Sequence, residues 1–262
     1  PCDRLPHCHV TVSRMIRIVH LKKDFRRVSV LRDVNLSIER GQATIIIGRS
    51  GCGKSVLLKH IIGLLRPDSG DIYIDGQNIT TFTKGELFEL RKRFGMLFQS
   101  AALFDSMSVG ENVGLGLREH TGLTEEEIAD RVRQRLKMVG LPRVEGMRVS
   151  ELSGGMKKRV GLARALAMDP EFVLFDEPTT GLDPIMADAI NELICELKSK
   201  LSSTIIVVTH DIVSAYKIGD RIAMLHDGEI VFTGTPEETN NTDNPIVRQF
   251  VTGSAEGPIQ AL

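Results

Sequence analysis

The chain has 262 residues, of which 42% are hydrophobic and 26% are charged, a composition that is ordinary for a globular protein. Lysine and arginine total 33 and aspartate and glutamate total 34, so the net charge of −1 gives no overall basic surface for nucleic acid. No apolar run approaches the roughly 18 residues of a membrane-spanning helix, so we expect another chain to supply any membrane-spanning part.

Cysteine and histidine residues crowd the N-terminus, at Cys2, His7, Cys8 and His9. Structural zinc sites usually draw on two separated pairs of ligands, so we favour a disordered leader over residues 1–14 rather than a metal site. This segment lacks the apolar core of a secretory signal peptide. The four cysteines of the chain do not have the spacing of a disulfide framework, which favours a reducing compartment.

Short β-branched segments alternate with helix-like segments in the first part of the chain, which predicts an α/β fold with buried parallel strands. We expect strands at residues 16–21, 28–38, 43–47, 72–74 and 94–98, and a helix over residues 84–93. Another helix follows the glycine-rich segment after residue 47, and its apolar face comprises Val56, Leu57, His60, Ile61 and Leu64.

From about residue 100 to about residue 160, strand-like segments are missing and charged, helix-favouring residues take their place. Residues 124–139 predict a helix, and Thr124 with Glu127 three positions later fits a capping box at its start. We therefore expect a helical insert. The alternation then resumes with helices at 154–168, 185–201 and 212–218, strands at 172–175 and 204–209, and a hairpin of strands 221–226 and 229–233.

The glycine-rich segment after the strand at 43–47 matches the pattern G-x-x-x-x-G-K-[ST], which binds nucleotide phosphates. Its members are Gly48, Arg49, Ser50, Gly51, Cys52, Gly53, Lys54 and Ser55. Small residues let backbone N–H groups surround the phosphates, and the helix N-terminus adds partial positive charge. Lys54 would reach the β- and γ-phosphates of ATP, and Ser55 would hold Mg²⁺.

Cys52 lies inside this loop, near a helix N-terminus and near Lys54. Both features favour the thiolate form of a cysteine, so we expect Cys52 to react readily with alkylating reagents. The alternative is a chemically silent small residue at a variable position of the loop.

Two carboxylates, Asp176 and Glu177, follow the apolar strand at 172–175. A buried strand delivers such charges to its carboxyl end, where ligands bind in parallel sheets. Asp176 would hold Mg²⁺ through water, and Glu177 would polarise the attacking water as the general base. With the phosphate loop upstream, this pair predicts a P-loop NTPase, but the two motifs do not say which kind.

The segment Ser153-Gly154-Gly155 precedes a helix and lies shortly before the acidic strand. Ser153 offers a hydroxyl, and the two glycines leave the N–H groups of a helix start open to an anion. With this segment the chain resembles the ATP-binding cassette (ABC) family over nearly all of residues 16–235. The resemblance implies a P-loop NTPase (RecA-like) ABC core with a β-rich lobe and an inserted α-helical subdomain. It also implies that this segment binds the γ-phosphate of ATP held by a second copy of the chain.

The resemblance assigns roles to four further residues. Gln99 looks like the glutamine that contacts Mg²⁺ and the attacking water, and Asp183 lies in a loop that looks like the one crossing the dimer interface. His210 looks like the switch histidine that contacts the γ-phosphate and orients Glu177. Phe25 matches, by position alone, the aromatic residue that stacks on adenine, and a core phenylalanine is nearly as good an interpretation.

One departure from the ABC pattern is Met156, because the signature segment usually ends in glutamine and methionine cannot offer the same hydrogen bonds. Met156, residues 98–120, residues 183–185 and the tail at 244–250 resemble the ATPases of Mla/Mce-type phospholipid transport systems. This resemblance implies an ATPase dimer held by a separate integral-membrane permease at the cytoplasmic face of the inner membrane. It also implies a lipid-binding Mce-type protein in the complex and phospholipid movement that maintains lipid asymmetry. The helical insert and the surface after Gln99 should receive the coupling helices of the permease.

The tail at residues 236–262 is mostly polar but carries one apolar cluster. Ile246, Val247, Phe250 and Val251 fall on one face of a short helix, which must dock because short isolated helices are marginal in water. It docks either on its own chain or on a second copy, where it would act as a dimerisation or assembly element. The ATPase domain proper would then span residues 15–235.

Three alternative functions remain open or are disfavoured by specific features. An ABC importer of a small polar solute shares every catalytic residue, and only residues 98–120, Met156 and the tail argue against it. A soluble ABC protein that acts on DNA or ribosomes is disfavoured, because it needs a long coiled-coil insertion or two cassettes in one chain and this sequence shows neither. A P-loop kinase is disfavoured by residues 152–156 and by His210.

Overall fold

The computed structural model describes residues 14–26 and 28–260. The N-terminal cysteine and histidine cluster, and all but the last residue of the predicted leader, lie outside the described residues. Within the described part, no helix is both long enough and apolar enough to cross a membrane.

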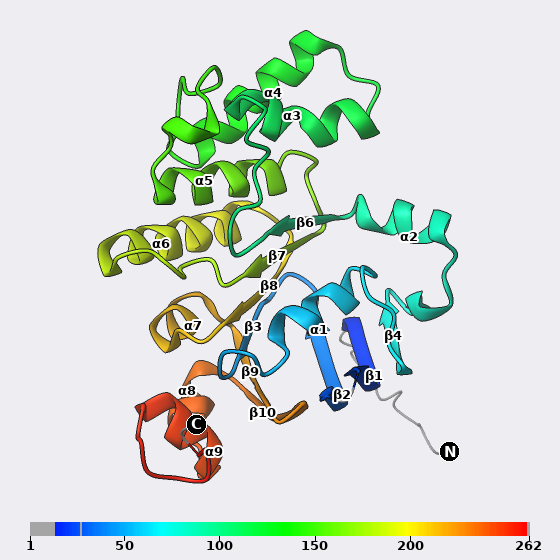
Figure 1. Cartoon of the computed structure of the whole chain (residues 1–262), viewed down its shortest axis with the longest axis vertical. Helices are drawn as coiled ribbons and strands as arrows, with labels where there is room; N and C mark the ends of the chain where they lie inside the picture. Colours follow the sequence, from blue (N-terminus) through cyan, green and yellow to red (C-terminus); the bar gives the residue numbers. More distant parts are fainter. Residues whose placement is uncertain (1–13, 27, 261–262) are drawn as a thin grey trace, which may run out of the picture.

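One ten-stranded sheet organises the chain, in the order β5-β4-β1-β2-β10-β9-β3-β8-β7-β6 (Figure 1). The strands are β1 (Arg14–Phe25), β2 (Val28–Glu39), β3 (Ala43–Ile47), β4 (Ser69–Ile74), β5 (Gln77–Asn78), β6 (Phe94–Leu97), β7 (Phe172–Asp176), β8 (Thr204–Thr209), β9 (Arg221–His226) and β10 (Glu229–Gly234). β1, β2, β4 and β5 pair antiparallel and form the predicted β-rich lobe. β9, β3, β8, β7 and β6 pair parallel in register, as in a nucleotide-binding core.

Nine α-helices and two short 3₁₀ turns complete the described part of the chain. The helices are α1 (Lys54–Ile61), α2 (Lys84–Arg91), α3 (Val109–His120), α4 (Glu125–Met138), α5 (Gly154–Ala165), α6 (Pro184–Lys200), α7 (Ile212–Ile218), α8 (Pro236–Asn240) and α9 (Pro245–Thr252). The turns are η1 (Ile79–Thr81) and η2 (Val149–Glu151). This architecture confirms the predicted α/β core with a β-rich lobe and a helical insert.

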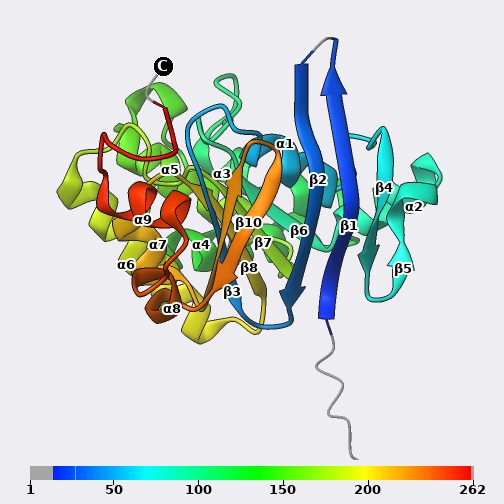
Figure 2. The same ribbon diagram turned by 90° about the horizontal axis from the view of Figure 1, so that it is seen from below.

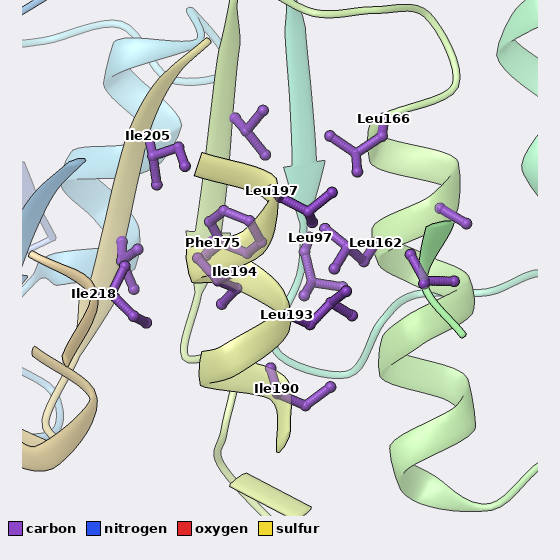
Figure 3. Packing of buried hydrophobic residues seen from close by; sticks show 14 of the residues in the cluster. Leu97, Leu162, Leu166, Phe175, Ile190, Leu193, Ile194, Leu197, Ile205 and Ile218 are labelled. Carbon is purple, nitrogen blue, oxygen red and sulfur yellow. The ribbon is translucent and has the colours of Figure 1, made fainter. Parts of the chain in front are cut away.

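The parallel strands are buried on both faces, and alternate residues enter two different cores because successive side chains of a strand point to opposite faces. Ile45 and Phe175 belong to a core with α5, α6 and α7, whereas Ile46 and Leu174 belong to a core with α1 and the β-rich lobe. In the first core, β6 and β7 face α5 and α6 through Leu97, Phe175, Leu162, Leu166, Leu193, Ile194 and Leu197 (Figure 3). The two layers of helices hold the carboxyl ends of the strands in fixed positions.

The helical insert consists of α3, α4 and α5, which pack together at the end of the molecule farthest from α8 and α9 (Figure 1). The predicted capping box is confirmed, since Thr124 Oγ1 accepts from the Glu127 N–H and Glu127 accepts from the Thr124 N–H. Val113, Leu117, Ile128, Val132 and Leu136 are buried between the helices. This packing joins the insert to the sheet through α5, which contacts β6.

The tail packs on its own chain, beside β9 and β10 (Figure 2). Val247 is fully buried in the main core, and Ile246, Phe250 and Val251 pack against that core while staying partly accessible. Of the two docking alternatives, this structure therefore has the intrachain one. The role of the tail in dimerisation or assembly stays a prediction.

Several element predictions need correction. Residues 236–240 are not merely polar tail, because they form α8, whose Thr235 and Glu238 make a capping box and whose Thr239 is buried. Leu64 does not belong to the apolar face of α1, which ends at Ile61, and Leu64 is 48% exposed. The helix α3 was not foreseen as a separate element of the insert.

Candidate active site

The phosphate loop, residues 48–55, connects β3 to α1 at the carboxyl edge of the parallel strands. Gly53 is the N-cap of α1 and has φ 104°, a left-handed conformation that favours glycine. At Gly48, a Cβ atom would lie 2.4 Å from the carbonyl oxygen of Leu225, so any side chain would force β9 and the loop apart. These two positions explain why the loop needs its glycines.

Lys54 is buried at the start of α1, with 5% of its surface exposed. Its ammonium donates to the carbonyl oxygens of Gly48 at 2.7 Å and Arg49 at 2.9 Å. The same Nζ lies 3.4 Å from Oε1 of Glu177. Lys54 therefore links the phosphate loop to the predicted general base.

Ser55 and Asp176 meet as the sequence predicted, since Ser55 Oγ donates to Oδ1 of Asp176 at 2.7 Å. Burial raises the pKa of Asp176, the hydrogen bond from Ser55 opposes this rise, and the neighbouring Glu177 adds to it. A hydroxyl and a carboxylate are hard oxygen ligands, which Mg²⁺ prefers. The donor set thus fits the predicted metal, although among the described residues no cluster of three or more His, Cys, Asp or Glu side chains could hold a metal by itself.

Glu177 lies directly after β7 and has φ 50°, a left-handed backbone conformation that is uncommon for glutamate. Its Oε2 lies 2.8 Å from Nδ1 of His210, and it accepts from Thr180 Oγ1 at 3.1 Å and from Thr209 Oγ1 at 3.4 Å. The structure therefore brings His210, Glu177 and Lys54 together.

Ser153 is the N-cap of α5, and its Oγ accepts from the Met156 N–H at 3.3 Å. Ser153 and Gly154 are exposed, whereas Gly155 is buried against α6, where a Cβ atom would meet the Met186 methyl group at 2.4 Å. Within residues 14–26 and 28–260, no hydrogen bond joins Ser153 to the phosphate loop. The signature segment is thus accessible and separate from the loop of its own chain.

The remaining predicted residues lie around this edge. Gln99 is exposed and follows β6, and its backbone carbonyl accepts from the Lys158 ammonium. Asp183 is the N-cap of α6 and its side chain accepts from the N–H groups of Ile185 and Met186. Phe25 ends β1, is 41% exposed and lies 5.5 Å from the ammonium of Lys23, so it is not the core phenylalanine of the alternative interpretation.

The surroundings of Cys52 oppose the reactive thiol that its sequence position predicted. Burial raises its pKa, and this effect outweighs the opposing influence of the nearby Lys54 ammonium. The side chain is half-buried and packs against the core that contains α1. A raised pKa leaves less thiolate at neutral pH, so this environment favours slow rather than ready alkylation, and the reactivity of Cys52 stays a prediction.

Sequence reasoning missed Lys158, Thr180 and Thr209. The two threonines donate to Glu177, and nothing in their pattern distinguishes them from ordinary strand and loop threonines. Lys158 did carry a signal, because it falls on the buried face of α5 between Gly155 and Leu162, where helical periodicity predicts an apolar residue.

Comparison with known proteins places this geometry in context. The family model described as "ABC transporter" matches residues 31–180. The chain is 44% identical to the "Probable ribonucleotide transport ATP-binding protein mkl" of Mycobacterium leprae (strain TN) over 244 residues, which cover 93% of this chain and 70% of that protein. It is 42% identical to the "Intermembrane phospholipid transport system ATP-binding protein MlaF" of Escherichia coli (strain K12), with 90% of each chain covered.

Solved structures give the same answer for the fold. A dimeric ATP-binding cassette in a post-hydrolysis state, bound to ADP and phosphate, superposes with a TM-score of 0.79 at 34% identity, covering 85% of this chain and 99% of the other. The cbiO1 protein of Clostridium perfringens, part of the ABC transporter complex cbiONQ, has a TM-score of 0.80 at 32% identity and covers 90% of this chain and 94% of its own.

Proposed function

Because the chain belongs to the ABC transporter family as an ATP-binding, ATP-hydrolysing subunit, we propose that Glu177 is the general base of its hydrolysis. The observation that carries this proposal is the position of the Glu177 carboxylate, 3.4 Å from the Lys54 ammonium and 2.8 Å from His210 Nδ1. The carboxylate thus lies beside the loop that binds the phosphates, within reach of a water that attacks the γ-phosphate.

The surrounding residues would bind the nucleotide and its metal ion. The phosphate loop and Lys54 bind the phosphates, and Ser55, Asp176 and Gln99 would hold Mg²⁺. Bound Mg²⁺ would neutralise the charge that develops on the phosphate oxygens. His210 holds the Glu177 carboxylate in place through Nδ1, which leaves its other ring nitrogen for the γ-phosphate. Phe25 would stack on adenine.

ATP hydrolysis requires two copies of the chain in this proposal. The exposed Ser153 and Gly154, with Gly155 behind them, would bind the γ-phosphate of ATP in the phosphate loop of the partner copy. Asp183, at the exposed start of α6, would lie at the dimer interface. The dimeric state of the ADP-bound cassette that resembles this chain supports such an arrangement.

A membrane permease is the second proposed partner, and an apolar groove supports it. The groove has a volume of about 770 Å³ and runs between α2, β6, α3 and α5. Its lining includes Phe88, Phe94, Met96, Phe104, Leu115 and Met168. Phe104, which follows Gln99 by five residues, is 49% exposed in it. An amphipathic helix from a permease would fit such a groove, and the loop after Gln99 would connect it to the active site.

Phospholipid is the transported substrate that we propose, with the permease in the inner membrane and an Mce-type lipid-binding protein in the complex. The support is the 42% identity to an ATPase named for intermembrane phospholipid transport over 90% of both chains. A small polar solute is the second candidate, because the chain is 44% identical over 93% of its length to a protein named for probable ribonucleotide transport.

Replacement of the general base tests the hydrolytic assignment. We expect Glu177→Gln to lower kcat by about 10²–10⁴-fold, since the amide cannot take the proton, while nucleotide affinity is retained. The measurement is steady-state ATPase activity beside equilibrium binding of a fluorescent ATP analogue. Glu229→Gln, on an exposed part of β10, is the control. An unchanged hydrolysis rate for Glu177→Gln would refute the assignment.

A pair of charge substitutions tests the groove. Phe104→Asp should abolish co-purification of the permease, because an aspartate in an apolar groove must lose its hydration. Leu64→Asp is a matched control, since Leu64 is 48% exposed and lies outside the groove. Equal permease yield from both variants would exclude the groove as the docking site.

The substrate is then identified by mass spectrometry of the intact complex in mild detergent. Phospholipids and an Mce-type protein retained with the permease would support the first candidate. A retained ribonucleotide or other small polar solute, without lipid enrichment over the detergent control, would support the second.

A further inference from the structure

Lys158 is a buried lysine whose side chain contacts the backbone of two predicted catalytic loops. Its ammonium donates to the carbonyl oxygen of Gln99 and, at 3.3 Å, to the carbonyl oxygen of Glu177. Only 6% of its surface is exposed. A buried charge is costly unless it makes strong hydrogen bonds, so these two carbonyls are what allow a lysine at this position.

The backbone that Lys158 contacts is strained. Glu177 has φ 50°, and in the loop after Gln99 both Ala101 and Ala102 have positive φ, at 61° and 46°. A left-handed conformation is unfavourable for a non-glycine residue, so it persists only where the surrounding contacts hold it. The carbonyl of Glu177 is one of the groups so held.

A second cation of α5 secures the same loop. Arg164 donates to the carbonyl oxygens of Ala102 and Ala101, each at 2.7 Å. Lys158 and Arg164 therefore fasten residues 99–102 to α5 at two points. Ser153 is the N-cap of the same helix, so the signature segment and both cations belong to one helix.

We propose that Lys158 is a positioning residue that sets the backbone of Glu177 and Gln99 from the signature helix α5. It acts through the carbonyl groups of these two residues. Since five residues of helix separate Lys158 from Ser153, about 7.5 Å along the axis, the engagement of the signature segment with a partner's ATP is transmitted to the hydrolytic groups of the same chain. This inference rests on the proposed role of Glu177 as the general base.

Three substitutions of Lys158 test the proposal in the full-length chain. Lys158→Met removes the donors and keeps the length, Lys158→Gln keeps a neutral donor, and Lys158→Arg keeps the charge and several donors. We expect Lys158→Met to lower kcat by about 10–100-fold with KM and nucleotide affinity within about threefold, because misplacement of catalytic groups by about 1 Å has effects of this size. Lys158→Arg should retain most of the activity, and Lys158→Gln should be intermediate. Lys137→Met, at an exposed lysine of α4, is the matched control.

A double substitution separates positioning from general loss of structure. In a Glu177→Gln chain, Lys158→Met should have much less effect on the residual rate than in the wild-type chain, because the group that it positions is gone. Full additivity, or a parallel loss of nucleotide affinity in all three Lys158 variants, would overturn the proposal. Unchanged kcat in Lys158→Met would also overturn the proposal. If Lys158→Met does not fold, the other two variants decide, because the proposal requires a higher kcat for Lys158→Arg than for Lys158→Gln. Should Glu177→Gln itself stay active, the proposed function fails rather than this inference.

Discussion

At Cys52, two opposite influences on a thiol meet in one side chain. The Lys54 ammonium and the nearby helix start favour the thiolate, whereas burial against α1 and the β-rich lobe disfavours any charged form. Burial is the larger effect, so the pKa of the Cys52 thiol lies above its ordinary value. The loop therefore has a small, weakly reactive residue at this position.

The alkylation rate of Cys52 should reflect this raised pKa. We expect a maleimide to label Cys52 slowly at pH 7, with a rate that still increases above the ordinary cysteine pKa of about 8.5, because only the thiolate reacts. The measurement is labelling at each cysteine, followed by peptide mass spectrometry over a series of pH values. The unfolded chain in denaturant is the control. Rapid labelling at pH 7 that levels off below pH 8 would mean that the thiol is activated instead.

At the scale of elements, α9 shows how a short helix is stabilised by docking. It has eight residues, too few to be stable alone in water. Asn244 caps its start, Gly253 ends it with φ 67°, and the fully buried Val247 anchors it in the main core. Gln249 adds hydrogen bonds to the backbone of Ser254 and Ile259, which hold the following segment against the helix.

Shortening the Val247 side chain should therefore destabilise the folded chain. Val247→Ala removes two buried methyl groups, and we expect a loss of about 2 kcal/mol from the free energy of unfolding. Arg248→Ala, one position further on the exposed side of the helix, should change it by less than about 0.5 kcal/mol. Urea denaturation of both variants measures the difference. Equal stability would mean that α9 does not dock where the structure has it.

The elements differ in how well the sequence predicted them, for physical reasons. The strand at 43–47 and the helix at 212–218 were predicted with their observed bounds, since one is a short run rich in β-branched residues and the other follows a clear strand. α3 escaped because it contains Gly110, Gly114 and Gly116, which lower helix propensity, although its Ser108–Glu111 capping box was a usable signal.

Sequence motifs predicted some contacts of the candidate site but not the effects of burial. Ser55 and Asp176 were expected to lie close together as ligands of one Mg²⁺, and they are in contact. The Glu177–His210 contact was expected only from the resemblance to the ABC family. The pKa of Cys52 and the role of Lys158 were not, because both depend on how deeply a side chain is buried between elements distant in sequence. Helical periodicity could have shown that Lys158 falls on an otherwise apolar helix face. It could not have shown which carbonyl groups Lys158 contacts.

At the scale of the whole molecule, one chain carries both halves of the proposed ATP site on separate surfaces. Lys54 is buried in the phosphate loop beside Glu177, and Ser153 is exposed at the start of α5 with no hydrogen bond to that loop in the described part of the chain. If each site combines the loop of one copy with the signature segment of the other, two differently damaged chains should complement each other in one dimer.

Mixed dimers test this arrangement with Lys54→Ala, which removes the phosphate-binding charge, and Ser153→Arg, whose bulky cation blocks closure on the partner's ATP. Each variant alone should be inactive. A dimer of one Lys54→Ala chain with one Ser153→Arg chain contains a wild-type loop facing a wild-type signature segment, so it should recover hydrolysis at that site. A dimer of wild type with a doubly substituted chain contains no such pair and should stay inactive. ATPase assays on the two tagged heterodimers measure the contrast, with Ser153→Ala as the control for loss of the helix cap, which costs roughly 0.5–2 kcal/mol. The reverse pattern, with activity only in the second dimer, would mean that each chain completes its own site.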